Sequence, residues 1–132
     1  MSVQNYGTVL VTVADKDKQE ALPLVRRFYN LGFNIIATEG TAKFLKENGI
    51  RTRTVQKISD GSSDILDAMR QGYISYVINT KDLSSTKVHS DGAEIRKAAT
   101  ENNATIFTAL DTVKVLLDVL EEITLSISTI DA

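Results

Sequence analysis

Hydroxyl and ammonium side chains stand directly after several apolar segments of this chain, and together they have the chemistry of an anion site. The four that matter most are Lys18, Thr38, Thr41 and Lys57. Two threonines around a glycine at a helix start offer two hydroxyls and several backbone N–H groups to one anion, and the lysines supply the neutralising charge. The pattern therefore predicts a phosphate cradle.

A further apolar segment is followed by Asn79, Thr80 and Lys81, which we place on the same rim. Each residue taken singly has a simpler interpretation, because a lone threonine usually caps a helix and a lone lysine is usually solvated. Convergence favours the site: ligands of open parallel sheets bind outside the carboxyl ends of the strands, where helix N-termini and free N–H groups meet.

Other candidate groups are weaker. Asp60, Asp64 and Asp67 could act as general acids or bases, but acidic residues in a first helical turn also favour the positive end of the helix dipole. His89 could titrate near neutrality, yet it stands in a polar segment with no strand end to fix it. The chain has neither a Walker-type loop nor a GxGxxG motif, which disfavours a nucleoside triphosphatase or a dinucleotide enzyme.

The elements that must position these side chains alternate between two periodicities. Strands are predicted at 8–14, 33–37, 50–56, 74–79 and 104–108, and helices at 21–31, 42–48, 64–71, 93–102 and 113–123. A turn is predicted at 38–41 and a long loop at 80–92. Exposed arginines put the third strand at a sheet edge. The alternation predicts an α/β, doubly wound (Rossmann/flavodoxin-like) three-layer sandwich with a five-stranded parallel sheet.

Length and composition fit one domain. The chain has 132 residues, of which 42% are apolar, and we expect the domain at 7–124, with a linker start at 1–6 and a tail at 125–132. A net charge of -2 gives no general attraction to nucleic acid or to an anionic membrane. No cysteine and a single histidine exclude a disulfide framework, a thiolate nucleophile and a multi-histidine metal site. Without a signal or spanning segment, a soluble cytoplasmic protein is expected.

Five segments, in order and at comparable spacing, resemble one known family. They are TVLVTVADKDK (8–18), ATEGT (37–41), VQK (55–57), DG (60–61) with Ile65, and YVINT (76–80). The chain resembles, from about Gly7 into its last helix, the methylglyoxal-synthase-like regulatory domain at the C-terminal end of the carbamoyl phosphate synthetase large subunit. The resemblance implies one domain of a far larger enzyme.

The resemblance also implies allosteric nucleotide binding, with uridine monophosphate (UMP) as inhibitor and inosine monophosphate (IMP) or phosphoribosyl pyrophosphate (PRPP) as activator. It places the phosphate contacts on Lys18, Thr38, Thr41 and Lys57. The positions around the phosphate, ribose or base are then Thr12, Gly40, Ile65, Asn79, Thr80, Lys81 and Asp91. Lys81 departs from the sequence pattern of this domain in the enteric enzymes, which have a second threonine at that position. An extra cation suits a more highly phosphorylated effector such as PRPP, or the side chain points to solvent.

For the parent enzyme, the resemblance implies ATP-dependent carbamoyl phosphate synthesis for pyrimidine or arginine formation, with Mg²⁺ or Mn²⁺ and a glutaminase small subunit as partner. No catalytic residue, cofactor or metal is expected in this domain.

Two alternatives stay open. The first is a stand-alone methylglyoxal synthase acting on dihydroxyacetone phosphate; those enzymes need a histidine-aspartate pair at the end of the first strand, where this chain has Ala14 and Asp15. Asp64 is the candidate for another of their aspartates, but no imidazole stands with it. The second is a structural oligomerisation domain that uses the apolar face of Val113–Ile123.

Overall fold

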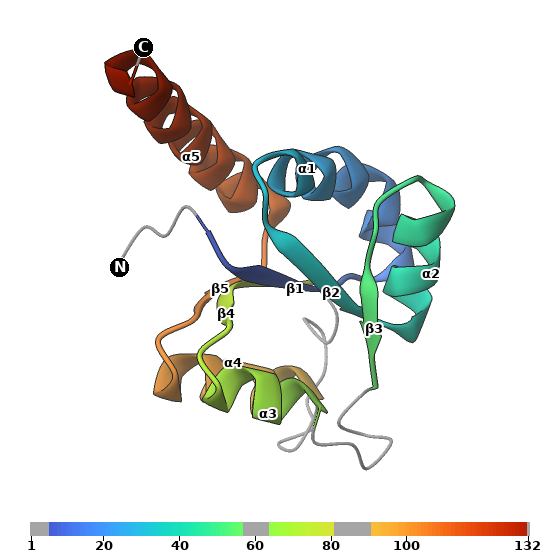
Figure 1. Cartoon of the computed structure of the whole chain (residues 1–132). Helices are drawn as coiled ribbons and strands as arrows, with labels where there is room; N and C mark the ends of the chain where they lie inside the picture. The colour runs from blue at the N-terminus through green and yellow to red at the C-terminus, as the bar shows by residue number, and fades with distance from the viewer. Residues whose placement is uncertain (1–5, 57–63, 81–90, 132) are drawn as a thin grey trace.

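A five-stranded, all-parallel sheet forms the middle layer of the protein (Figure 1). The computed structural model describes residues 6–56, 64–80 and 91–131, and within these the side chains of all but 91–93 and 126–131. The strands are β1 (Thr8–Thr12), β2 (Asn34–Thr38), β3 (Arg53–Val55), β4 (Ile74–Asn79) and β5 (Thr105–Phe107), in the order β3-β2-β1-β4-β5. The sheet confirms the predicted fold class and puts β3 at an edge, as its exposed arginines suggested.

The central strand is buried on both sides, as expected of a parallel sheet between two helical layers. Val9 and Val11 of β1 enter one core and Leu10 enters the other, and all three are fully buried. This explains why the first apolar run of the sequence has so little polar alternation. Its last two residues, Val13 and Ala14, lie beyond the strand and lead into the short 3-10 helix η1 (Asp15–Asp17).

Helices cover the two faces of the sheet unequally. The helices are α1 (Lys18–Asn30), α2 (Glu39–Glu47), α3 (Asp64–Arg70), α4 (Asp91–Glu101) and α5 (Leu110–Asp131). The first core holds buried side chains of α1, α2 and α5, and the second holds those of α3 and α4. Figure 1 shows α1, α2 and α5 on one side of the sheet and α3 and α4 on the other. Three helices therefore pack on one face and two on the other.

Four helices begin two or three residues before their predicted starts, and the largest differences in the structure are in α2 and α5. Helix α2 begins at Glu39 rather than Ala42, so the predicted turn is its first helical turn; the chain needs no separate turn because the extended Thr38 (φ -69°, ψ 160°) already serves as N-cap. Helix α5 continues through residues 125–131, which were expected to form a tail. Of the predicted loop, 81–90 lies outside the described residues, and 91–92 is already helical.

Helix α1 contains a proline and is followed by a glycine. Pro23 lies in its second turn, and Gly32, with φ of +98°, follows its C-cap Leu31. The apolar face of α5, which the oligomerisation alternative would use, contributes Val113, Leu117 and Leu120 to the first core. Among the described residues, no helix is both long and apolar enough to cross a membrane.

Candidate functional site

The carboxyl ends of β1, β2 and β4 form a rim where the order of the sheet reverses. Helices α1 and α2, which follow β1 and β2, cover one face, whereas α4, which follows β4, covers the other. Thr12 of β1 is aligned with Asn79 of β4, so both side chains stand at this reversal. Open α/β sheets bind ligands at such a point because the loops diverge to opposite faces there.

Buried hydroxyls of two neighbouring strands meet at the rim. The Thr38 hydroxyl donates a hydrogen bond to Thr12 Oγ1 over 3.4 Å, and both residues are buried. Thr38 is the N-cap residue of α2, but its side chain makes no capping hydrogen bond within the described residues. The simple capping interpretation therefore does not account for Thr38, whose hydroxyl faces β1 instead.

Two further threonines fix the backbone that leaves β1. Thr41 Oγ1 accepts the Val13 N–H over 3.4 Å, and Thr80 Oγ1 accepts the Ala14 N–H over 2.9 Å. Thr41 belongs to the first turn of α2 and is fully buried, and Thr80 follows β4. Thr41 and Thr80 thus hold two consecutive backbone N–H groups, one hydroxyl on each. These contacts order the segment that leads to η1 and Lys18.

Lys18 brings a cation to the start of α2. Its Nζ lies 2.7 Å from Asp15 Oδ1, and only 19% of its side chain is exposed. A Cβ built on Gly40 would lie 3.7 Å from the same Nζ, so the ammonium stands beside the glycine of the first turn of α2. The positive end of the helix dipole and the ammonium act in the same direction there, and both favour an anion.

The structure brings together a large part of the predicted site. The positions that share this network of contacts are Thr12, Lys18, Thr38, Gly40, Thr41 and Thr80. Asn79 is buried at the end of β4, next to them. This arrangement can hold an oxyanion through hydroxyls, backbone N–H groups and one cation.

Other predicted positions stand elsewhere or lie outside the described residues. Ile65 is buried in the second core, with Leu10 and Val55. Asp91 is the first residue of α4, and its side chain is not among those that the structure describes. The predicted positions in the segments that the structure does not describe are Lys57, Asp60, Lys81 and His89.

Asp64 and Asp67 occupy the first turn of α3, where their charge favours the helix dipole. Asp64 Oδ2 accepts the Gln56 N–H over 3.3 Å, and Asp67 forms an ion pair with Arg70 at 3.5 Å. Among the described side chains, no group of three acidic or histidine residues is arranged to hold a metal ion.

Sequence reasoning missed the role of Asp15 as the partner of Lys18. The three-residue spacing of opposite charges was the available signal, because such side chains meet on a helical turn. It also missed that the threonine hydroxyls bind the backbone of β1, since those contacts join residues 28 and 66 positions apart.

Comparisons with known proteins agree with this fold. A sequence profile of the MGS-like domain family matches residues 20–108, about two thirds of the chain. The structure is similar to that of a methylglyoxal synthase from Elizabethkingia anophelis NUHP1, with a TM-score of 0.70 and 21% identity over 87% of this chain and 79% of that one. It is also similar to ForH, with a TM-score of 0.60 and 21% identity over 89% and 80% of the two chains.

Proposed function

This chain belongs to the MGS-like domain family, and on that premise we propose that it is an allosteric regulatory domain of the carbamoyl phosphate synthetase large subunit. Its rim binds the phosphate of a nucleotide effector. UMP is the first ligand to test, and IMP and PRPP are the alternatives for the same site. The resemblance of segments 8–18, 37–41 and 76–80 to that domain supports the finer assignment within the family.

The observation that carries the proposal is the position of the Lys18 ammonium beside Gly40, at the N-terminal turn of α2. A glycine leaves room for an anion to approach the backbone N–H groups. The phosphate then replaces the exposed Asp15 carboxylate, which now occupies the ammonium. A dianion has more charge than this carboxylate, so the exchange favours the ligand.

The buried threonines support binding because they are already ordered. Thr12, Thr38 and Thr41 are held by the strand ends and by each other, so little side-chain freedom is lost when a ligand arrives. Lys57 and Lys81 are proposed as further cations for the phosphate. The base lies toward Asn79 and Asp91 in this proposal.

The domain acts by binding and not by catalysis. Ala14 stands two residues after β1, at the position where the related lyases have their histidine, and the chain has one histidine in all. Regulation requires contact with the rest of the large subunit, because allosteric coupling needs a second site and two states. The ATP, Mg²⁺ and glutaminase chemistry of the parent belongs to parts outside this chain.

Calorimetry with two ligands that differ only in phosphate tests the proposal. UMP is titrated into the protein, followed by uridine under the same conditions. We expect UMP to bind and uridine to bind at least about a hundredfold more weakly, because several charge-assisted hydrogen bonds are lost together. Equal affinities for the two ligands would contradict the proposed phosphate site.

A lyase acting on dihydroxyacetone phosphate is the second candidate, and the structural likeness to a methylglyoxal synthase is the observation in its favour. A colorimetric assay for methylglyoxal separates the two functions. Product above a buffer blank would assign catalysis to this domain and would show that Ala14 does not prevent it. We expect none.

A further inference from the structure

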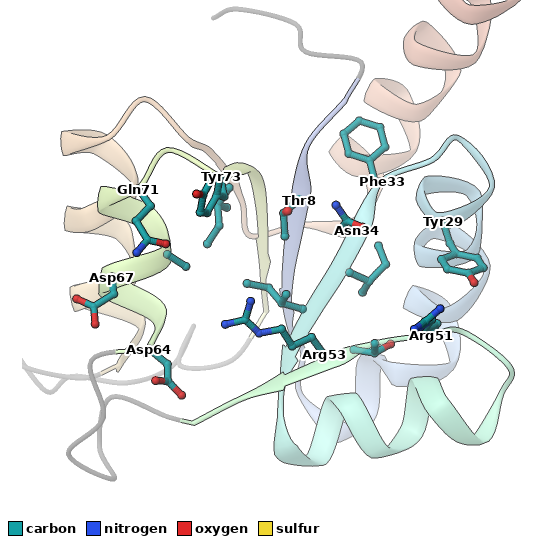
Figure 2. Close-up of a pocket in the computed structure, with 15 residues that line it drawn as sticks. Thr8, Tyr29, Phe33, Asn34, Arg51, Arg53, Asp64, Asp67, Gln71 and Tyr73 are labelled. Carbon is teal, nitrogen blue, oxygen red and sulfur yellow. The ribbon is translucent and has the colours of Figure 1, made fainter.

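A cavity of about 750 Å³ opens between β3 and α3, at the amino ends of the strands (Figure 2). We call it the β3–α3 groove. Its floor includes Thr8, Asn34 and Ile36 of the sheet, with Arg53 on one wall and Asp64 and Asp67 on the other. A volume of this size accommodates a small organic molecule.

The groove exists because two helices cannot cover five strands. Ile36 is aligned with Arg53 in the β2–β3 pair, and Thr8 with Asn34 in the β1–β2 pair. These strand positions alternate with the residues of the first core, so their side chains lie on the face of α3 and α4. No third helix packs over β2 and β3 on this face within the described residues, which leaves the groove open.

The groove is separate from the rim. Leu10, Val55 and Ile65 belong to the second core and are almost completely buried. They occupy the strand and helix positions between the floor of the groove and the threonines at the carboxyl ends, and none of the rim threonines lines the cavity. A ligand in the groove would therefore make its contacts independently of one at the rim.

The acidic wall and the arginine wall of the groove differ in whether their charged side chains have partners among the described residues. Asp67 pairs with Arg70, and Asp64 accepts the Gln56 N–H. Arg51 and Arg53 are exposed and form no ion pair with any described residue, although Arg27 and Arg70 both do. In Figure 2, the Arg53 guanidinium points from β3 into the space in front of α3. Arg51 and Arg53 therefore lack an anionic partner among the described residues.

We propose that the β3–α3 groove is a second ligand site, which takes a small molecule with one anionic group and a cationic group at its other end. The anion, a carboxylate or phosphate, binds the guanidinium of Arg53, whose fork of N–H donors suits it, and Arg51, which also lines the cavity, adds positive charge. The cationic end faces the acidic wall of Asp64 and Asp67. A polyanion is disfavoured because that wall repels it.

The experiment is an NMR titration of the ¹⁵N-labelled chain with three probes. 4-Aminomethylbenzoate carries both charges, benzoate only the anion and benzylamine only the cation. We expect the first to bind with a dissociation constant of about millimolar, and each of the others at least about threefold more weakly. Shifts of the Thr8, Asn34, Arg53 and Gln71 amides locate the site, because these residues line it.

Variants separate this site from the rim and from general charge effects. Arg53→Gln should weaken 4-aminomethylbenzoate at least about fivefold, and Arg53→Lys should weaken it less, since it keeps the charge but not the fork. Lys18→Ala should leave this binding unchanged. The proposal is overturned if the groove amides do not shift, if Arg53→Gln with a native-like spectrum binds as well as the unaltered chain, or if Lys18→Ala abolishes binding. None of these results depends on whether UMP binds.

Discussion

The rim and the β3–α3 groove place polar chemistry at opposite ends of the same strands but by different means. At the rim, threonine hydroxyls are buried and bind each other or the β1 backbone. In the groove, the charged side chains are exposed and two arginines lack an acidic partner among the described residues. Residues of the rim therefore support the fold as well as the candidate site, whereas the exposed charged side chains of the groove can be changed at little cost in stability.

The largest expected effect is on ligand binding at the rim. Lys18→Ala should weaken UMP by about tenfold to a hundredfold, because a hydrogen bond to a charged group contributes about 1.5–3 kcal/mol. Calorimetry measures the affinity, with Lys16→Ala as the matched control, since Lys16 is an exposed lysine two residues away. Equal losses in the two variants would mean that only overall charge attracts the ligand.

Stability should also suffer at the rim. Thr41→Val removes the buried acceptor of the Val13 N–H and should lower the free energy of unfolding by about 1–3 kcal/mol. Urea denaturation measures this value. Thr54→Val is the control, because Thr54 is exposed and its hydroxyl accepts a hydrogen bond from Lys46 at the surface. If both variants unfold at the same urea concentration, the buried hydroxyl of Thr41 does not stabilise the fold.

The ion pair between Arg27 and Glu121 lies away from both regions and gives a reference value for the stability that a partly exposed ion pair contributes. Hydrogen bonding from Arg27 lowers the pKa of Glu121 below its ordinary 4.5, and Asp118 lies 2.7 Å from the same guanidinium. This stabilisation is present above pH 4.5 and is lost as the pH falls through the lowered pKa. Glu121→Gln should remove that dependence at a cost of less than about 1 kcal/mol, because the Glu121 side chain is partly exposed.

Urea unfolding at pH 6 and pH 3 measures the effect, with Glu122→Gln as the control, because Glu122 is exposed on the same helix. An unchanged difference between the two pH values in Glu121→Gln would show that the α1–α5 ion pair contributes nothing in solution.

The smallest effect is expected in the groove. Arg53→Gln should change the free energy of unfolding by no more than about 0.5 kcal/mol, since exposed side chains without partners contribute little to stability. Urea denaturation tests it beside Thr41→Val. A loss as large as that of the rim variant would mean that Arg53 supports the sheet edge and would erase the distinction between the regions.

The strands and most helices could be predicted because each is a local pattern. Runs such as 8–12 and 74–79 are apolar and β-branched, and glycine follows α1, α2 and α3. The convergence of Lys18, Thr38 and Thr41 also followed from one rule, that parallel strands place their carboxyl ends at one edge. The start of α2 was misplaced because Glu39 and Gly40 carry no apolar periodicity.

The groove could not be predicted from the sequence, because it exists where no described helix covers β2 and β3 on the face of α3 and α4. Its arginines and aspartates come from β3 and α3, and their facing walls result from an unequal division of helices between the two faces. The arginines of segment 50–56 indicated only an edge strand. The Asp15–Lys18 ion pair is local in the sequence and was in principle predictable. Its relation to the candidate site was not, because Gly40 lies beside Lys18 only in the folded chain.

Gly40 lies at the first turn of α2, beside the ammonium of Lys18. Its backbone does not require a glycine, since Gly40 is helical and is not among the glycines with positive φ. A single methyl group would meet the Lys18 ammonium at 3.7 Å, an ordinary contact distance, so a larger side chain would have to share this space with the ammonium. If the rim binds a phosphate as proposed, side-chain volume at this one position determines how near the anion and the Lys18 ammonium can come to the first turn of α2.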